Sequence, residues 1–135
     1  MKICGIELKA NNTILSVIDF GEDDIIDYID LKIKKITLED DEDSSSVKTY
    51  YESINQFLES NSIEKVVLKK RAKKGAFSGG ATTFKMEGLI QLNNICDVQL
   101  LSAQTISSFE KKNKIEFPQK LTKYQQQSYL SILAS

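Results

Sequence analysis

The sequence predicts an α/β protein built on a mixed sheet, because strand patterns come first and helical patterns then alternate with strands. Residues 2–9 ("KICGIELK") and 13–20 ("TILSVIDF") are aliphatic segments separated by the turn residues "NN". Residues 25–38 alternate apolar and polar side chains and predict a third strand, with an irregularity near Lys35. These three segments are expected to form an antiparallel meander.

The second half of the chain predicts crossovers. Apolar residues from Val47 to Leu58 recur with helical spacing, and residues 64–70 contain the strand core "VVL". A strand reached through a helix normally lies parallel to a strand already in the sheet. The remaining elements are a helix at 80–94, a fifth strand at 96–101, a short helix beginning at Ser102 or Thr105, and a helix at 120–134. The predicted order is β-β-β-α-β-α-β-α-α, with five strands and helices on both faces of the sheet.

Composition limits the class of protein. The chain has 135 residues, 41% of them hydrophobic, which fits a single domain spanning residues 1–135. No apolar run approaches the roughly 18–20 residues that cross a bilayer, and the first residues lack the apolar core of a signal peptide. Cys4 and Cys96 lie in apolar segments typical of packed thiols rather than of a disulfide. We therefore expect a cytoplasmic protein with no membrane partner.

The absence of histidine narrows the chemistry. It removes histidine general bases, histidine-activated nucleophiles and the usual zinc ligands. Any metal would be a hard ion held by oxygen atoms, such as magnesium or manganese.

Charge is distributed unevenly. Residues 1–64 carry 15 acidic and 6 basic side chains, whereas residues 65–135 carry 4 acidic and 12 basic ones, giving charges of −9 and +8. This polarity favours binding of a polyanion on one face. The alternative is that acidic and basic segments pair with each other, within a monomer or across a dimer.

The basic residues gather between the fourth strand and the following helix. A glycine pair opens that helix, where backbone amides can approach a phosphate and ammonium groups can add charge. The segment lacks the spacing of a Walker loop or a dinucleotide site, and a solvated basic loop is the structural alternative. The predicted phosphate contacts are Lys69, Arg71, Lys73, Lys74, Gly79, Gly80 and Lys85.

Several segments resemble a known superfamily. "CGIELK", "VVLKKRAKKGAFSGGATTFKMEGLIQL" and "VQLLSAQTI" are similar to strands, loop and helix starts of the ribonuclease-H-like fold, in its RuvC-type and YqgF-type resolvase branch. "CGIELK", "LEDD" and "GAFSGGATTFKMEGLIQL" also resemble the bacterial family called domain of unknown function three thousand ten, over nearly the whole chain.

The resemblance implies a nuclease site made of carboxylates at strand ends and on the last helix, which hold two divalent ions. Glu7 falls on the first carboxylate position, and Lys70 aligns with the second. The last helix, "KLTKYQQQSYLSILAS", contains no Asp or Glu. We interpret the Lys70 ammonium as neutralising Glu7, so that neither a divalent metal nor another cofactor is expected. The alternative is that Lys70 points to solvent and Glu7 is an ordinary edge charge.

The sequence thus favours a catalytically degenerate RuvC-like domain that contacts nucleic acid through residues 69–80. One alternative is a protein-interaction module, expected as a homodimer. Another is a magnesium- or manganese-dependent nuclease with a rearranged site of Glu7, Glu87 and Asp97. The run Gln125–Gln127 is expected to be surface filler unless it lies on a dimer face.

Overall fold

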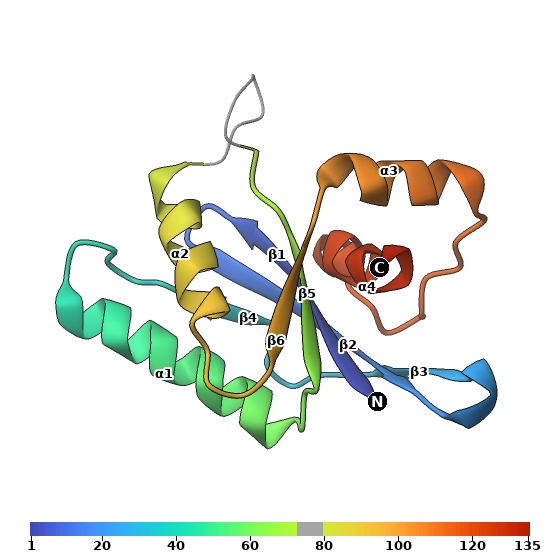
Figure 1. Ribbon diagram of the computed structural model, residues 1–135, viewed down its shortest axis with the longest axis horizontal. Coiled ribbons are helices and arrows are strands. Elements are labelled where there is room, and N and C mark those ends of the chain that lie inside the picture. The colour runs from blue at the N-terminus through green and yellow to red at the C-terminus, as the bar shows by residue number, and fades with distance from the viewer. Residues whose placement is uncertain (73–79) are drawn as a thin grey trace.

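A computed structural model describes residues 1–72 and 80–135 (Figure 1). Within these residues, six strands form one mixed sheet in the order β3-β2-β1-β5-β6, and β4 also pairs with β2. The strands are β1 (Lys2–Lys9), β2 (Asn12–Phe20), β3 (Ile26–Ile29), β4 (Lys35–Thr37), β5 (Lys65–Lys69) and β6 (Asp97–Leu101). The pairs formed by β2 are antiparallel, whereas β5 lies parallel to both β1 and β6. The predicted mixed sheet is confirmed.

The predicted third strand is two strands. β3 pairs with the second half of β2, and β4 pairs with its first half. Between them the chain leaves the sheet so that Leu31, only 5% exposed, can insert into the core. It returns where the Leu15 amide donates to the Lys34 carbonyl at 2.9 Å. Burial of the Leu31 side chain is therefore favoured over continuous pairing of β2 with a single third strand. Residues 1–72 and 80–135 contain six strands of the sheet instead of the expected five.

Helices cover both faces of the sheet, as predicted (Figure 1). One face carries α1 (Ser44–Ser60) and α2 (Ala81–Gln91). The other carries α3 (Ala103–Lys112) and α4 (Gln126–Ala134), the latter preceded by the short 3-10 helix η2 (Lys123–Gln125). None of the helices in the described parts of the chain is long and apolar enough to cross a membrane.

Strand β5 shows why the sheet needs both helical layers. Val66 and Leu68 face the core under α1 and α2, whereas Val67 faces the core under α3 and α4. All three side chains are fully buried. A central parallel strand that is buried on both sides reads as a continuous apolar run, which explains "VVL".

Helix α4 lies unusually close to β1 because Gly5 has no side chain. A Cβ atom built at Gly5 would lie 1.9 Å from the Ser128 carbonyl oxygen and 2.8 Å from Cγ1 of Ile132. The close approach brings the first turns of α4 over the ends of β1 and β5. It therefore sets the depth at which polar side chains of α4 reach the sheet.

A buried polar network holds the start of α4. Gln125 is completely buried, and its Nε2 donates to the Leu15 carbonyl at 2.8 Å. Its Oε1 accepts from both the backbone and the hydroxyl of Thr122 at 3.0 Å. The hydroxyls of Ser16 and Ser128 lie 2.6 Å apart beside it. Gln125 is thus a structural residue, and its prediction as surface filler was wrong.

A second buried polar pair predicts alkaline sensitivity. The Tyr50 hydroxyl shares a short hydrogen bond with Thr13 Oγ1, and both residues are buried. Burial raises the pKa of the Tyr50 phenol far above its ordinary value of 10.0, against a smaller opposing effect of Thr13. Burial likewise raises the pKa of the Cys4 thiol above 9.0, helped by Cys96.

Because the folded state holds both protons more tightly than the unfolded chain does, this stability is fully present below the unfolded pKa values and is lost as pH rises above them. We expect the urea midpoint to be steady up to about pH 8.5 and to fall between roughly pH 9 and 11. Urea titrations across that range measure it. Tyr50→Phe should be less stable at neutral pH, because Thr13 loses its partner, but should show a shallower alkaline decline. A midpoint that stays flat to pH 11 in the native chain would contradict the prediction.

Candidate functional site

The candidate site lies at the end of the sheet where the neighbouring strands β1 and β5 reach their carboxyl ends (Figure 1). The parallel register pairs Ile6 with Leu68, so the next residues, Glu7 and Lys69, lie side by side. Both point toward the face covered by α4, because Gly5, two residues before Glu7, contacts that helix. Strand alternation and register together bring an acid and a base into one spot.

Three side chains form the site, which we call the Glu7–Lys69–Gln127 cluster. The Lys69 ammonium lies 3.7 Å from Glu7 Oε2 and donates to Gln127 Oε1 at 2.9 Å. The side chains of Lys69 and Glu7 are only 20% and 15% exposed. The ammonium group of Lys69 on β5 therefore links β1 through an ion pair with Glu7 and α4 through a hydrogen bond to Gln127.

The partner of Glu7 is Lys69, so the expected Glu7–Lys70 pair was wrong. Alternation along the strand puts Lys70 on the same face as Val66 and Leu68, which pack together in one core cluster. That face, however, is the one under α1 and α2, whereas Glu7 points to the opposite one. Lys70 is exposed, and its backbone amide extends the sheet by donating to the Leu101 carbonyl at 2.8 Å.

This donor set does not fit a pair of divalent ions. Such a site needs several carboxylates facing one another. Here one carboxylate is paired with an ammonium group, and α4 contributes a neutral amide that is already engaged with the same ammonium. Among the described residues, no three His, Cys, Asp or Glu side chains are grouped closely enough to hold a metal.

The carboxylates of the alternative nuclease site do not come together. Glu87 is a buried residue of α2, on the other face of the sheet, and accepts from the Arg71 backbone amide at 3.2 Å. Asp97 begins β6 and pairs in register with Lys65. It therefore lies four residues of strand, about 13 Å, from the end of the sheet that holds Glu7.

The basic segment is partly occupied by contacts within the protein. Arg71 Nη1 donates to the Leu8 carbonyl at 2.8 Å, at the end of β1. Lys85 Nζ donates to the Asp41 carbonyl at 2.5 Å, and Thr82 Oγ1 donates to the Asp41 carboxylate at 3.2 Å. The acidic segment before α1 is thus tied to the start of α2. The Lys85 ammonium meets a backbone carbonyl, so the two segments are joined here by hydrogen bonds and not by an ion pair.

The remaining predicted phosphate contacts divide into two groups. Gly80 is the N-cap residue of α2 and has no side chain to cap that helix. A cavity of about 370 Å³ opens beside it, lined by Arg71 and Thr83 among others. Lys73, Lys74 and Gly79 lie outside the described residues.

Sequence reasoning missed Gln127. A glutamine within "YQQQSY" carries no pattern that separates a site residue from a surface residue. The available signal was positional, since the fold resemblance predicts that the last helix contributes to the site. That helix contains no carboxylate, and the amide of Gln127 accepts from Lys69 in its place.

Comparison with known proteins identifies the family of the chain. Residues 1–134 match the model of the family described as "Protein of unknown function (DUF3010)". The chain belongs to this family. No curated protein sequence matches the chain.

Solved structures share the fold of this DUF3010 protein. RuvC from Thermus thermophilus superposes with a TM-score of 0.72 at 9% identity, covering 99% of this chain and 92% of that one. The same protein in complex with a Holliday junction substrate gives 0.68 at 11% identity, covering 99% and 91%. The yeast mitochondrial Holliday junction resolvase gives 0.52 at 14%, covering 79% and 55%. The ribonuclease-H-like, RuvC-type fold is therefore confirmed; identities this low show the fold alone.

Proposed function

We propose that this DUF3010 protein is a non-cleaving nucleic-acid-binding domain in which a RuvC-type nuclease site has become a structural cluster. The observation that carries the proposal is the position of the Lys69 ammonium, between Glu7 and Gln127. A positive charge fixed there neutralises the only carboxylate of the cluster, and its electrostatic field disfavours entry of a divalent cation.

Nucleic acid would then be held by contacts to its phosphate groups from residues at the same end of the sheet. Lys70 is exposed at the end of β5, and the start of α2 presents amide groups without a side-chain cap. Lys73, Lys74 and Gly79 are proposed to add phosphate contacts. Contacts of this kind are independent of sequence and weaken steeply with salt. The structure of RuvC from Thermus thermophilus in complex with a Holliday junction substrate, which has the same fold, supports testing branched DNA first.

The two free cysteines fit the reducing conditions of the cytoplasm.

The test is fluorescence anisotropy with labelled single-stranded, duplex and four-way-junction DNA at two salt concentrations, with and without manganese. We expect binding at low salt that falls by about tenfold or more when salt is raised about fourfold. The triple variant Lys70→Glu, Lys73→Glu, Lys74→Glu should abolish it. A matched variant with Lys111→Glu, Lys112→Glu and Lys114→Glu, in and just after the last turn of α3, makes the same charge change and should retain most of the binding.

Two outcomes would overturn the proposal. Absence of binding to all three substrates at low salt would remove nucleic acid as the ligand. Cleavage that needs manganese and disappears in Glu7→Gln would show that the site is catalytic.

A further inference from the structure

A groove runs between the outer edge of β4 and the flank of α1, on a part of the molecule that the Glu7–Lys69–Gln127 cluster does not use. Its middle is a cavity of about 640 Å³. This cavity shares Thr37 and Glu39 with a cavity of about 270 Å³ toward the start of α1. It shares Ile33 and Phe57 with one of about 280 Å³ toward the end of that helix. The three cavities form one continuous channel beside α1.

In the part of the chain that the structure describes, the wall of the groove formed by β4 is a strand edge that pairs with no further strand. Ile36 pairs with Thr13 of β2, and the Leu15 amide donates to the Lys34 carbonyl. Alternation in an antiparallel ladder therefore turns the backbone groups of residues 34 and 36 toward β2. The amides and carbonyls of Lys35 and Thr37 point the other way, into the groove. An open edge of this kind is a template for pairing with another extended chain.

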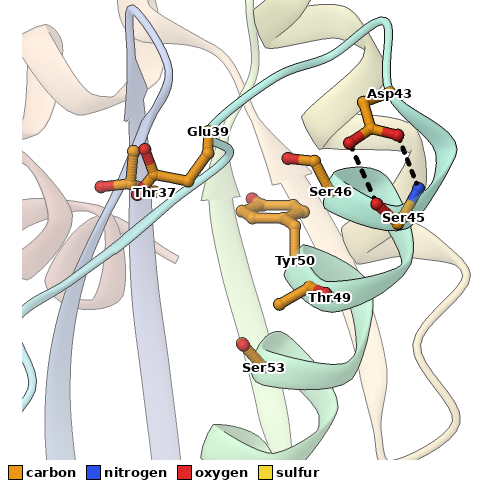
Figure 2. Close-up of a pocket in the computed structure, with 8 residues that line it drawn as sticks. All are labelled: Thr37, Glu39, Asp43, Ser45, Ser46, Thr49, Tyr50 and Ser53. Carbon is orange, nitrogen blue, oxygen red and sulfur yellow. Dashed lines mark hydrogen bonds between the residues drawn. The ribbon is translucent and has the colours of Figure 1, made fainter.

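The opposite wall offers side chains suited to an extended peptide. Figure 2 shows Ser46, Thr49 and Ser53 projecting from α1 on the side of the pocket that faces Thr37 and Glu39. Hydroxyl groups at this spacing suit the polar side chains of a strand. Farther along, the lining includes the apolar side chains of Phe57 and of Ile33, which is 57% exposed.

The charges give the groove a direction. The end near the start of α1 carries the exposed carboxylates of Glu39 and Asp43. The other end carries exposed Lys32 next to Ile33, together with exposed Asp30, whose carboxylate lies 3.7 Å from the Lys34 ammonium. A ligand that matches the groove has a basic residue at the first end and an aliphatic side chain over Ile33.

We propose that the groove binds an extended peptide segment of a partner protein, which adds a strand to the edge of β4. The peptide carries a Lys or Arg that reaches Glu39 and Asp43 and an aliphatic residue that packs on Ile33 and Phe57. The length agrees, because the 17 residues of α1 span about 25 Å and about eight extended residues cover the same distance. Main-chain hydrogen bonds provide affinity, and alternate side chains provide selectivity.

A peptide suits the groove better than a second copy of this chain. The edge of β4 in another copy is itself flanked by that copy's α1, so pairing of two edges would have to fit two helices beside them. A single strand has no such flank. The inference does not depend on nucleic-acid binding, which is proposed for the carboxyl end of β5 and the start of α2.

The probe is a displayed library of random octapeptides, selected on the full chain and followed by synthesis of the enriched sequences. We expect enriched peptides with alternating apolar and polar residues and one basic end. Ile33→Glu should weaken their binding by about tenfold or more, equivalent to about 1.4 kcal/mol. Ile25→Glu is the matched control, because Ile25 is 64% exposed and lies outside the groove. It should leave binding unchanged.

Backbone chemistry distinguishes strand addition from ordinary side-chain docking. N-methylation of every second amide removes the donors of one edge of the peptide. One of the two alternating N-methyl sets should abolish binding, and the other should be tolerated. The proposal is overturned if no octapeptide is enriched, if Ile33→Glu and Ile25→Glu bind equally, or if both N-methyl sets bind. Sedimentation that shows a dimer split by Ile33→Glu would assign the groove to a second copy instead.

Discussion

Gly5→Ala should destabilise the protein by about 3 kcal/mol, and Gly5→Val should prevent stable folding. The added Cβ would lie 1.9 Å from the Ser128 carbonyl oxygen, an atom of the helix backbone that cannot move without displacing α4. Displacing α4 would also strain the buried hydrogen bond that Gln125 makes to β2. Unfolding in urea measured by circular dichroism gives the free energy directly.

The matched control for this prediction is Gly88→Ala in α2. A Cβ at Gly88 meets nothing within 4 Å. Alanine is favoured over glycine inside a helix, so this change should be neutral or stabilising by up to about 1 kcal/mol. Similar effects at both glycines would show that α4 does not pack against β1 as closely as described.

Lys69→Glu combined with Gln127→Asp should create a divalent-metal site at the Glu7–Lys69–Gln127 cluster. The two changes place three carboxylates where the Glu7–Lys69–Gln127 cluster now holds one carboxylate, an ammonium and an amide. Without metal, repulsion among carboxylates that are partly buried should destabilise the variant by about 1–3 kcal/mol. Manganese at about 100 times its dissociation constant should then restore about 2.7 kcal/mol.

Thermal unfolding with and without manganese measures this gain. We expect the melting temperature of the double variant to rise by about 8–10 °C with the metal and that of the native chain to stay unchanged. Lys70→Glu combined with Gln126→Asp makes the same charge change one residue away on both elements and should not respond. A native chain whose melting temperature rises with manganese, and loses that response in Glu7→Gln, would show that Glu7 already binds metal.

The sequence by itself determined the class of fold and most of its elements. Turn residues separated the first two strands, helical spacing marked α1, and the apolar run "VVL" predicted the strand β5. These features are local, because the spacing of apolar residues and the chemistry of turns act within a few residues. The resemblance to the RuvC-type branch added the topology, which the structural comparisons confirm.

Only the tertiary structure decided which residues meet. Lys69 and Lys70 are adjacent and chemically identical, and one step along a strand moves a side chain to the opposite face. The partner of Glu7 therefore depended on which face of β5 lies under α4. The sequence of the strand itself does not indicate which helix covers each of its faces. Leu31 interrupted a strand for the same kind of reason, since its burial is decided by the distant helix layer that covers it. Gln125 and Gln127 read alike as surface glutamines, and only the close approach of α4 over Gly5 gave each one a buried or half-buried partner across 58 or more residues of chain.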